Sequence, residues 1–122
     1  MEGSSLLTEI ACKVSIIVVN WNGASLLNDC LGSLCRQLYG CTEIIFVDNG
    51  STDFSVSYVK DKFPNVKVVE LSENSGFAGG NALGLQVASG DFIALLNNDS
   101  RADERWLETI MQPMLQDPTA VD

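Results

Sequence analysis

The stretch Val14–Asn20, VSIIVVN, decides the fold, because it is short, almost wholly apolar and rich in β-branched residues. Such a run predicts a strand buried on both faces, as in the middle of a parallel sheet. Apolar residues then recur with helical spacing, at Leu26, Leu27, Cys30, Leu31, Leu34, Cys35 and Leu38. A buried strand followed directly by an amphipathic helix is the first unit of an α/β fold.

The same alternation repeats along the chain. We predict further strands at residues 43–48, 66–71 and 91–96. We predict further helices after the capping residues 51–53, over residues 77–88, and from a first turn with Asp103 and Glu104 to a kink or end at Pro113. Four such units predict one domain over residues 1–122: a Rossmann-like, mostly parallel sheet with helices on both faces and right-handed crossovers. A further strand is expected after the last helix, so we expect the chain to be truncated.

Charge and composition exclude several classes of function. The net charge of −9, with 7 Lys and Arg, argues against a nucleic-acid binder. The absence of His removes His-based catalysis and His-ligated zinc. The 4 Cys form no C-x-x-C pair, which favours reduced thiols. The sequence shows no signal peptide and no apolar run of about 18 residues, so we expect a cytoplasmic protein.

Polar residues gather where each predicted strand ends. The four segments are NWNG at 20–23, DNGSTD at 48–53, SENSGFAGGN at 72–81 and NNDS at 97–100. In a parallel sheet all of these ends lie at one edge, which is where ligands bind in such folds. Each segment alone is explained by a turn or a helix cap. Four of them at one edge favour a ligand site.

Two features of these segments point to phosphate and metal chemistry. Asp99 is a candidate ligand for Mg²⁺ or Mn²⁺, which take oxygen ligands and often need few protein carboxylates beside substrate phosphates. The glycines at 76, 79, 80 and 84 either allow close packing of helix on sheet or expose backbone N–H groups to a phosphate. The segment does not have the G-x-G-x-x-G pattern, and the absence of G-K-[ST] excludes a Walker-type phosphate loop.

Four motifs in order, VSIIVVNWNG, IIFVDNGSTD, NSGFAGGNALGL and GDFIALLNND, resemble the nucleotide-sugar half of family 2 glycosyltransferases. They look most like the bacterial subgroup that contains rhamnosyltransferases, and the resemblance covers about residues 13–118. It implies the A-type glycosyltransferase fold and inverting transfer from a nucleoside diphosphate sugar, UDP- or dTDP-type, to a polysaccharide or other glycan acceptor. Such enzymes serve cell-wall or polysaccharide biosynthesis.

The same resemblance implies roles for individual residues. The base and ribose are expected at Val19, Asn20, Trp21, Asp48 and Asn49, where many relatives carry two acids in place of Asp48–Asn49. Residues 74–81, including Asn74, Gly76 and Asn81, are expected to form the lip around the nucleotide and its diphosphate. Asn97 and Asn98 are expected to hydrogen-bond sugar or ribose, and Asp99 to hold the metal.

The resemblance also implies what lies elsewhere. The general base is expected beyond Asp122, so no catalytic residue is assigned within the chain, which is expected to bind donor without efficient turnover alone. The acceptor is expected to be a glycan or a lipid-linked glycan, and the full-length protein is expected to be peripheral at the inner membrane face. An exposed sheet edge is expected to favour an added strand or a homo-oligomer.

Two other readings compete. In a dinucleotide-binding domain Asp48 would hold a ribose, but the first loop, NWNG, lacks the glycine fingerprint. In a receiver-like, non-enzymatic module Asp48 would be the phosphoacceptor. Such modules need an acidic pair after the first strand and a late Lys, whereas that strand ends in Asn20 and no Lys follows Lys67.

Overall fold

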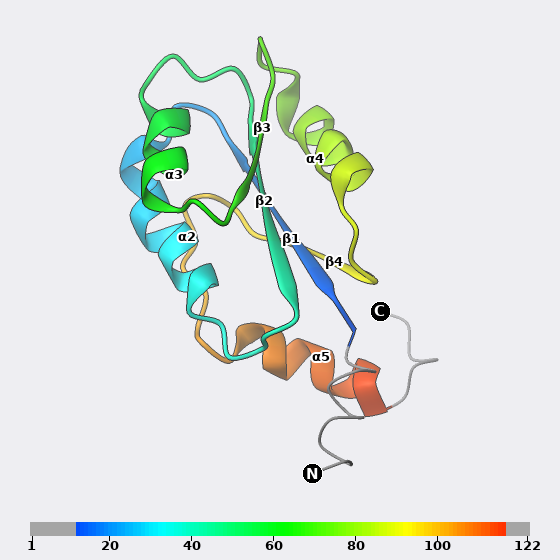
Figure 1. Ribbon diagram of the computed structural model, residues 1–122. Helices are drawn as coiled ribbons and strands as arrows, with labels where there is room; N and C mark the ends of the chain where they lie inside the picture. Colours follow the sequence, from blue (N-terminus) through cyan, green and yellow to red (C-terminus); the bar gives the residue numbers. More distant parts are fainter. Residues whose placement is uncertain (1–11, 117–122) are drawn as a thin grey trace.

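A single parallel sheet forms the centre of the computed structural model, which describes residues 12–116, with side chains described through residue 113 (Figure 1). Its strands are β1 (Val14–Asn20), β2 (Thr42–Asp48), β3 (Lys67–Glu70) and β4 (Phe92–Leu95), in the order β3-β2-β1-β4. Every neighbouring pair is parallel. The predicted sheet is therefore confirmed, and β1 has the predicted bounds.

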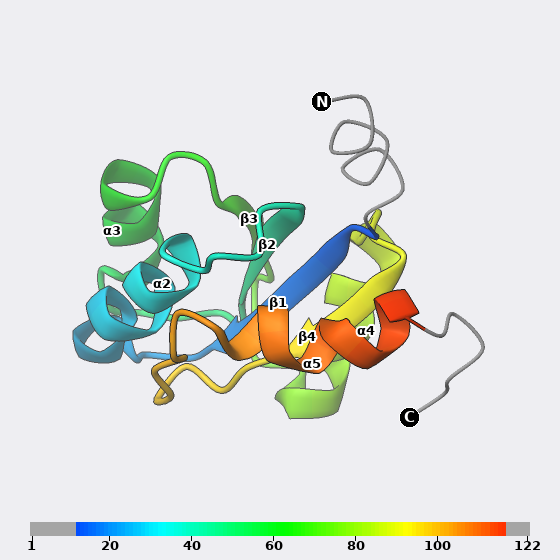
Figure 2. The ribbon, with the colours of Figure 1, turned by 90° about the horizontal axis from the view of Figure 1, so that it is seen from below.

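Helices cover both faces of the sheet. They are the 3-10 helix η1 (Ala24–Leu26) and the α-helices α2 (Leu27–Cys35), α3 (Ser55–Lys62), α4 (Gly76–Val87) and α5 (Trp106–Gln116). Figure 2 shows α4 on the opposite side of the sheet from α2 and α3. No helix within residues 12–116 is long and apolar enough to cross a membrane.

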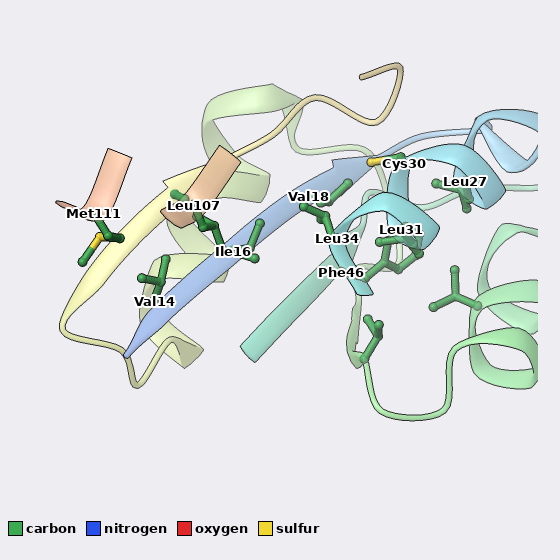
Figure 3. Close-up of a cluster of buried hydrophobic side chains, with 13 residues drawn as sticks. Val14, Ile16, Val18, Leu27, Cys30, Leu31, Leu34, Phe46, Leu107 and Met111 are labelled. Atoms are coloured by element: carbon green, nitrogen blue, oxygen red, sulfur yellow. The ribbon is translucent and has the colours of Figure 1, made fainter. Parts of the chain in front are cut away.

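The alternating side chains of β1 feed two separate cores. Ile16 and Val18 pack with Leu31, and the same cluster extends to residues from α3 and α5 (Figure 3). Ile17 points to the other face and packs in a smaller cluster beneath α4. Burial of both faces explains why β1 is apolar almost throughout, because neither face has access to water.

Close packing of α4 on the sheet accounts for two of its glycines. A Cβ on Gly84 would stand 2.7 Å from Cγ2 of Ile17, and one on Gly80 would stand 2.7 Å from Cγ1 of Val19. Real Cβ atoms do not approach that closely, so any side chain at either position would push the helix off the sheet. Of the two explanations for the glycine-rich segment, close packing therefore holds for these two positions.

Helix boundaries differ from the prediction where loops from elsewhere intervene. α2 ends at Cys35, because the backbone N–H of Leu38 bonds the carbonyl of Glu104 instead of continuing the helix. α3 begins at Ser55, after the expected capping residues. Asp103 and Glu104 precede α5 rather than lying in its first turn. α5 continues through Pro113, where we predicted a kink or an end.

Candidate functional site

The carboxyl ends of β1 and β4 flank the point where strand order reverses. From β1 the chain runs outward to β2 and then β3, and it returns to the other side of β1 as β4. Ligands of open α/β sheets bind in the crevice outside this switch point. The segments after β1 and β4 are those with Asn20 and with Asn97, Asn98 and Asp99.

Asn20 joins both sides of the switch point through its buried amide. Its Nδ2 donates to Oδ1 of Asp48 at 3.1 Å, and its Oδ1 accepts from Nδ2 of Asn98 at 2.8 Å. Asn20 is 0% and Asp48 2% exposed. The structure thus brings Asp48 and the 97–99 segment to one rim, as we predicted from the parallel arrangement of the strands.

The carboxylate of Asp48 is held from two more directions. Its Oδ1 accepts from the hydroxyl of Ser51 at 2.7 Å, and its Oδ2 accepts from the backbone N–H of Ser51 at 2.8 Å. A buried carboxylate needs such partners to offset the loss of water. Its burial also removes the receiver-like reading, because a phosphoacceptor has to be reachable by the phosphoryl donor.

The loop after β1 interlocks with the loop after β2. Asn22 adopts the left-handed conformation, with φ of 50°, and its Oδ1 accepts the N–H groups of Thr52 at 2.8 Å and Asp53 at 3.1 Å. In return Ser51 Oγ accepts the N–H of Asn22 at 2.8 Å, and Asp53 accepts the N–H of Ala24 at 3.1 Å. We expected residues 51–53 to cap a helix, so their role in joining two loops was missed. The one signal was the pair of Asn residues in NWNG, which tolerate this conformation.

The remaining predicted residues fall into three groups: one buried residue that joins two loops, a set of exposed or half-buried residues at the loop ends, and one residue within α4. Asn49 is 2% exposed and bonds the segment before α4. Four others form an exposed rim at the ends of the same loops: Trp21, Asn74, Gly76 and Asn97, with Asn98 and Val19 half-buried beneath them. The outlier is Asn81, whose Nδ2 donates to the carbonyl of Phe77 within α4 at 3.2 Å. Within the described part of the chain, no hydrogen bond joins the Asn81 side chain to the other predicted residues.

Asp99 is an exposed carboxylate near the rim residue Asn97, in a turn closed by a 3.0 Å bond from the N–H of Ser100 to the carbonyl of Asn97. The described residues contain no cluster of three acidic or Cys side chains suited to a metal ion. One carboxylate beside amide oxygens is an all-oxygen donor set, which fits a hard cation that also binds ligand oxygens. Asp99 therefore fits Mg²⁺ or Mn²⁺ only as part of a site shared with a ligand.

Cys30 lies beneath this turn and is fully buried. Its Sγ is 3.6 Å from the carbonyl oxygen of Asn97. Burial, and to a lesser degree the charge of Asp99, raise the pKa of Cys30 to about 11. The thiol is therefore neutral near pH 7, and it packs as a small apolar group instead of serving as a thiolate ligand.

A separate depression of about 230 Å³ lies between α2 and residues 101–104. Its lining includes Arg36 and Arg101 together with Asp103 and Glu104. Cationic and anionic groups of similar number do not favour a charged ligand of either sign. The polar groups that converge at the switch point, and not this depression, form the candidate site.

The chain is similar to known proteins over most of its length. Residues 15–122 match the protein-family model described as "Glycosyl transferase family 2". The uncharacterized glycosyltransferase YibD of Escherichia coli is 31% identical over 108 residues, which are 86% of this chain and 31% of that protein. A poly(ribitol-phosphate) beta-glucosyltransferase of Bacillus spizizenii is 36% identical over 104 residues, 77% of this chain and 16% of its own length. The chain thus spans a third or less of these two relatives.

Two solved structures have the same arrangement of strands and helices. TarS 1-349 of S. aureus, in complex with UDP-GlcNAc, aligns with a TM-score of 0.80 at 27% identity, over 85% of this chain and 31% of that one. The mannosyltransferase PcManGT of Pyrobaculum calidifontis, in complex with GDP-Man and Mn²⁺, aligns with a TM-score of 0.72 at 26% identity, over 79% and 32%. With the family match over most of its length and the A-type fold of these enzymes, the chain belongs to glycosyl transferase family 2.

Proposed function

We propose that this chain binds the nucleoside diphosphate sugar of an inverting glycosyltransferase, with a UDP- or dTDP-type donor and a divalent cation. The observation that carries the proposal is the buried bridge from Asp48 through Asn20 to Asn98. It holds the ends of three strands together and leaves Asp99 exposed at the same rim. Such preorganisation lowers the entropic cost of binding a polar ligand.

We assign the parts of the donor to parts of the rim. The base and ribose are placed against Val19 and Trp21, above the buried Asp48, since the Trp21 side chain, 55% exposed, offers an apolar ring for stacking. The diphosphate is placed between Asp99 and the first turn of α4, whose backbone N–H groups and dipole favour anions. Mg²⁺ or Mn²⁺, when bound, would neutralise diphosphate charge in a protein that itself carries a net charge of −9.

The solved relatives support the ligand class. TarS was solved with UDP-GlcNAc, and PcManGT with GDP-Man and Mn²⁺. Both ligands are nucleoside diphosphate sugars, although their bases differ. The choice of UDP or dTDP here rests on the resemblance of the motifs, as does the proposed rhamnosyltransferase-like subgroup.

The acceptor half of the reaction is proposed from the family alone. We place the general base beyond Asp122 and take the acceptor to be a glycan or lipid-linked glycan of cell-wall or polysaccharide synthesis. The full-length protein is placed in the cytoplasm, peripheral at the inner membrane face. On this proposal the 122-residue chain binds donor and transfers sugar poorly by itself.

Calorimetric titration with UDP, dTDP and GDP, with and without Mn²⁺, tests the donor proposal. We expect Mn²⁺ to tighten binding of UDP or dTDP by about tenfold or more, which is about 1.4 kcal/mol. Asp99→Asn should abolish that gain. Asp61→Asn is the matched control, because it also removes one negative charge from an exposed side chain, here near the C-terminal end of α3. A wild-type chain that binds none of these nucleotides with Mn²⁺, or an undiminished Mn²⁺ gain in Asp99→Asn, contradicts the proposal.

We also propose self-association through the outer edge of β4. Within the described residues β4 pairs only with β1, and its side chains Ile93 and Leu95 are 40% and 52% exposed. Unpaired edges with apolar side chains invite pairing with another strand. Light scattering over a range of concentrations should show a dimer that Leu95→Lys disrupts, and a monomer at every concentration rules this out.

A further inference from the structure

Asn49 follows β2 directly, and its side chain turns toward the segment that leads into α4, which carries the rim residues Asn74 and Gly76. Its Oδ1 accepts the backbone N–H of Ser75 at 2.9 Å and the hydroxyl of Ser75 at 3.1 Å. Its Nδ2 donates to the carbonyl of Gly76 at 2.9 Å. These bonds use three of the four hydrogen-bonding positions of the amide. With 2% of Asn49 exposed, little of the side chain remains for a ligand.

The two segments joined by Asn49 touch closely enough to exclude side chains. Gly50 has a φ of 81°, and a Cβ there would lie 2.7 Å from Cα of Glu73 and 3.0 Å from the backbone N of Asn74. On the other side, a Cβ on Gly80 would lie 3.3 Å from Nδ2 of Asn49. Asn49 is thus the polar tie inside a tight joint between the β2 loop and the start of α4.

This tie also changes how α4 begins. Ser75 occupies the N-cap position, where a Ser hydroxyl commonly accepts an N–H from the first turn. Here Ser75 makes no side-chain cap bond, and its hydroxyl donates to Asn49 instead. The N–H of Gly76 is bonded to Oδ1 of Asn74 at 2.7 Å. Because the Ser75 side chain makes no cap bond, it leaves the N–H groups that follow Gly76 in the first turn uncapped. Uncapped N–H groups at a helix start are available to an anion.

We infer that Asn49 is a positioning residue that sets the first turn of α4 against the diphosphate of the donor and makes no contact with the base. The inference rests on the proposed function and deepens it. It assigns Asn49 a different role from the base contact that the family resemblance implies. The carboxamide is suited to the role because it accepts from Ser75 and donates to Gly76 at once.

A comparison of UDP with uridine distinguishes the two roles, because uridine has the base and ribose but no diphosphate. In Asn49→Ala we expect UDP with Mn²⁺ to bind about 5- to 10-fold more weakly, which corresponds to about one lost hydrogen bond. Uridine binding, followed by NMR titration, should be unchanged. Equal weakening of uridine and UDP means that Asn49 contacts the base, and unchanged UDP binding means that the tie does not serve the donor. Either result overturns the inference.

Amide hydrogen exchange of the nucleotide-free chain tests the tie by itself. The N–H of Ser75 should exchange about tenfold faster in Asn49→Ala, because the variant lacks the hydrogen bond to Asn49 that protects this N–H in the wild type. Asn49→Asp keeps the acceptor for Ser75 but puts an oxygen against the carbonyl of Gly76, so it should retain much of the protection while weakening UDP. Asn65→Ala, at an exposed turn after α3, is the control and should change neither.

Nucleotide binding and amide hydrogen exchange together distinguish failure of the proposed function from failure of the inference about Asn49. A wild-type chain that binds no nucleotide contradicts the proposed function, whereas the Ser75 exchange rate still reports on the tie. Unchanged exchange at Ser75 in Asn49→Ala overturns the tie even if UDP binds. If Asn49→Ala fails to fold, Asn49→Asp supplies both readings, and loss of its Ser75 protection or undiminished UDP affinity counts against the inference.

Discussion

Asn98 donates a 2.8 Å hydrogen bond to the side-chain oxygen of Asn20, although 78 positions separate the two residues in the chain. Because the same Asn20 amide donates to Asp48, one buried side chain joins the carboxyl ends of β1, β2 and β4. The turn that presents Asp99 is thereby held beside the β2 loop. The candidate site has a buried, hydrogen-bonded floor and an exposed rim.

Asn20→Ala should lower the free energy of unfolding by about 2–3 kcal/mol, because it removes the side-chain hydrogen bonds of a fully buried amide and leaves Asp48 and Asn98 without this partner. Urea denaturation measures the loss. Asn28→Ala is the control, since its side chain is exposed and accepts a hydrogen bond from the hydroxyl of Tyr58 at the surface. We expect the control to stay within about 0.5 kcal/mol of wild type. A similar loss in both variants would show that the buried bridge has no special weight.

Gly84→Ala should destabilise the fold even though Ala favours helices. The added Cβ would stand 2.7 Å from Cγ2 of Ile17, and overpacking of this kind costs about 1–3 kcal/mol. The gain in helix propensity offsets about 1 kcal/mol of that. Thermal unfolding should show a lower Tm than wild type, whereas Gly40→Ala, with nothing within 4 Å of its Cβ, should match wild type. A raised Tm for Gly84→Ala would mean that α4 moves freely on the sheet.

Glu43 should contribute stability that is lost in acid. Burial tends to raise the pKa of Glu43, but hydrogen bonds from Ser15 and Ser89 and the nearby charge of Lys13 outweigh burial and lower the pKa to about 2. Since this folded-state pKa lies below the ordinary value of 4.5, the contribution is complete above pH 4.5 and disappears as the pH falls toward 2.

Urea denaturation of Glu43→Gln tests this linkage. At pH 6 we expect the variant to be about 2 kcal/mol less stable than wild type, because charge-assisted bonds are replaced by neutral ones. The difference should shrink as the pH is lowered to 3, since wild type alone loses the contribution of an ionised Glu43. The other carboxylates titrate in both proteins and cancel in the comparison. A difference that does not change between pH 6 and pH 3 would contradict the lowered pKa.

The four cysteines should differ in reactivity. All four are free, Cys35 and Cys41 are exposed, and Cys30 is buried with its pKa raised to about 11. Iodoacetamide at pH 8 should therefore alkylate Cys41 quickly and leave Cys30 unmodified, because both burial and the small thiolate fraction protect it. Mass spectrometry of peptides reads each site, and all four should react in guanidinium chloride. Rapid labelling of Cys30 in the folded chain would mean that the 97–99 turn opens readily.

The class of fold was readable in the sequence because it depends on local periodicity. The strand-like run at Val14–Asn20 has a matching element with the same bounds, since both of its faces are buried and its composition reflects that. The predicted strands at 66–71 and 91–96 are longer than β3 and β4. Both are edge strands with one neighbour each, so pairing ends sooner than the apolar pattern does.

The sequence by itself determined that strands and helices alternate. It therefore also determined that Asn20, Asp48 and Asp99 lie at one edge of a parallel sheet. Only the tertiary structure decided that Asn49 bonds Ser75, that Ser51 holds Asp48, and that Asp99 remains exposed. The physical reason is range. Helix and strand periods are set by neighbours a few positions apart, whereas a side chain finds a hydrogen-bond partner only after loops from distant parts of the chain have been packed together.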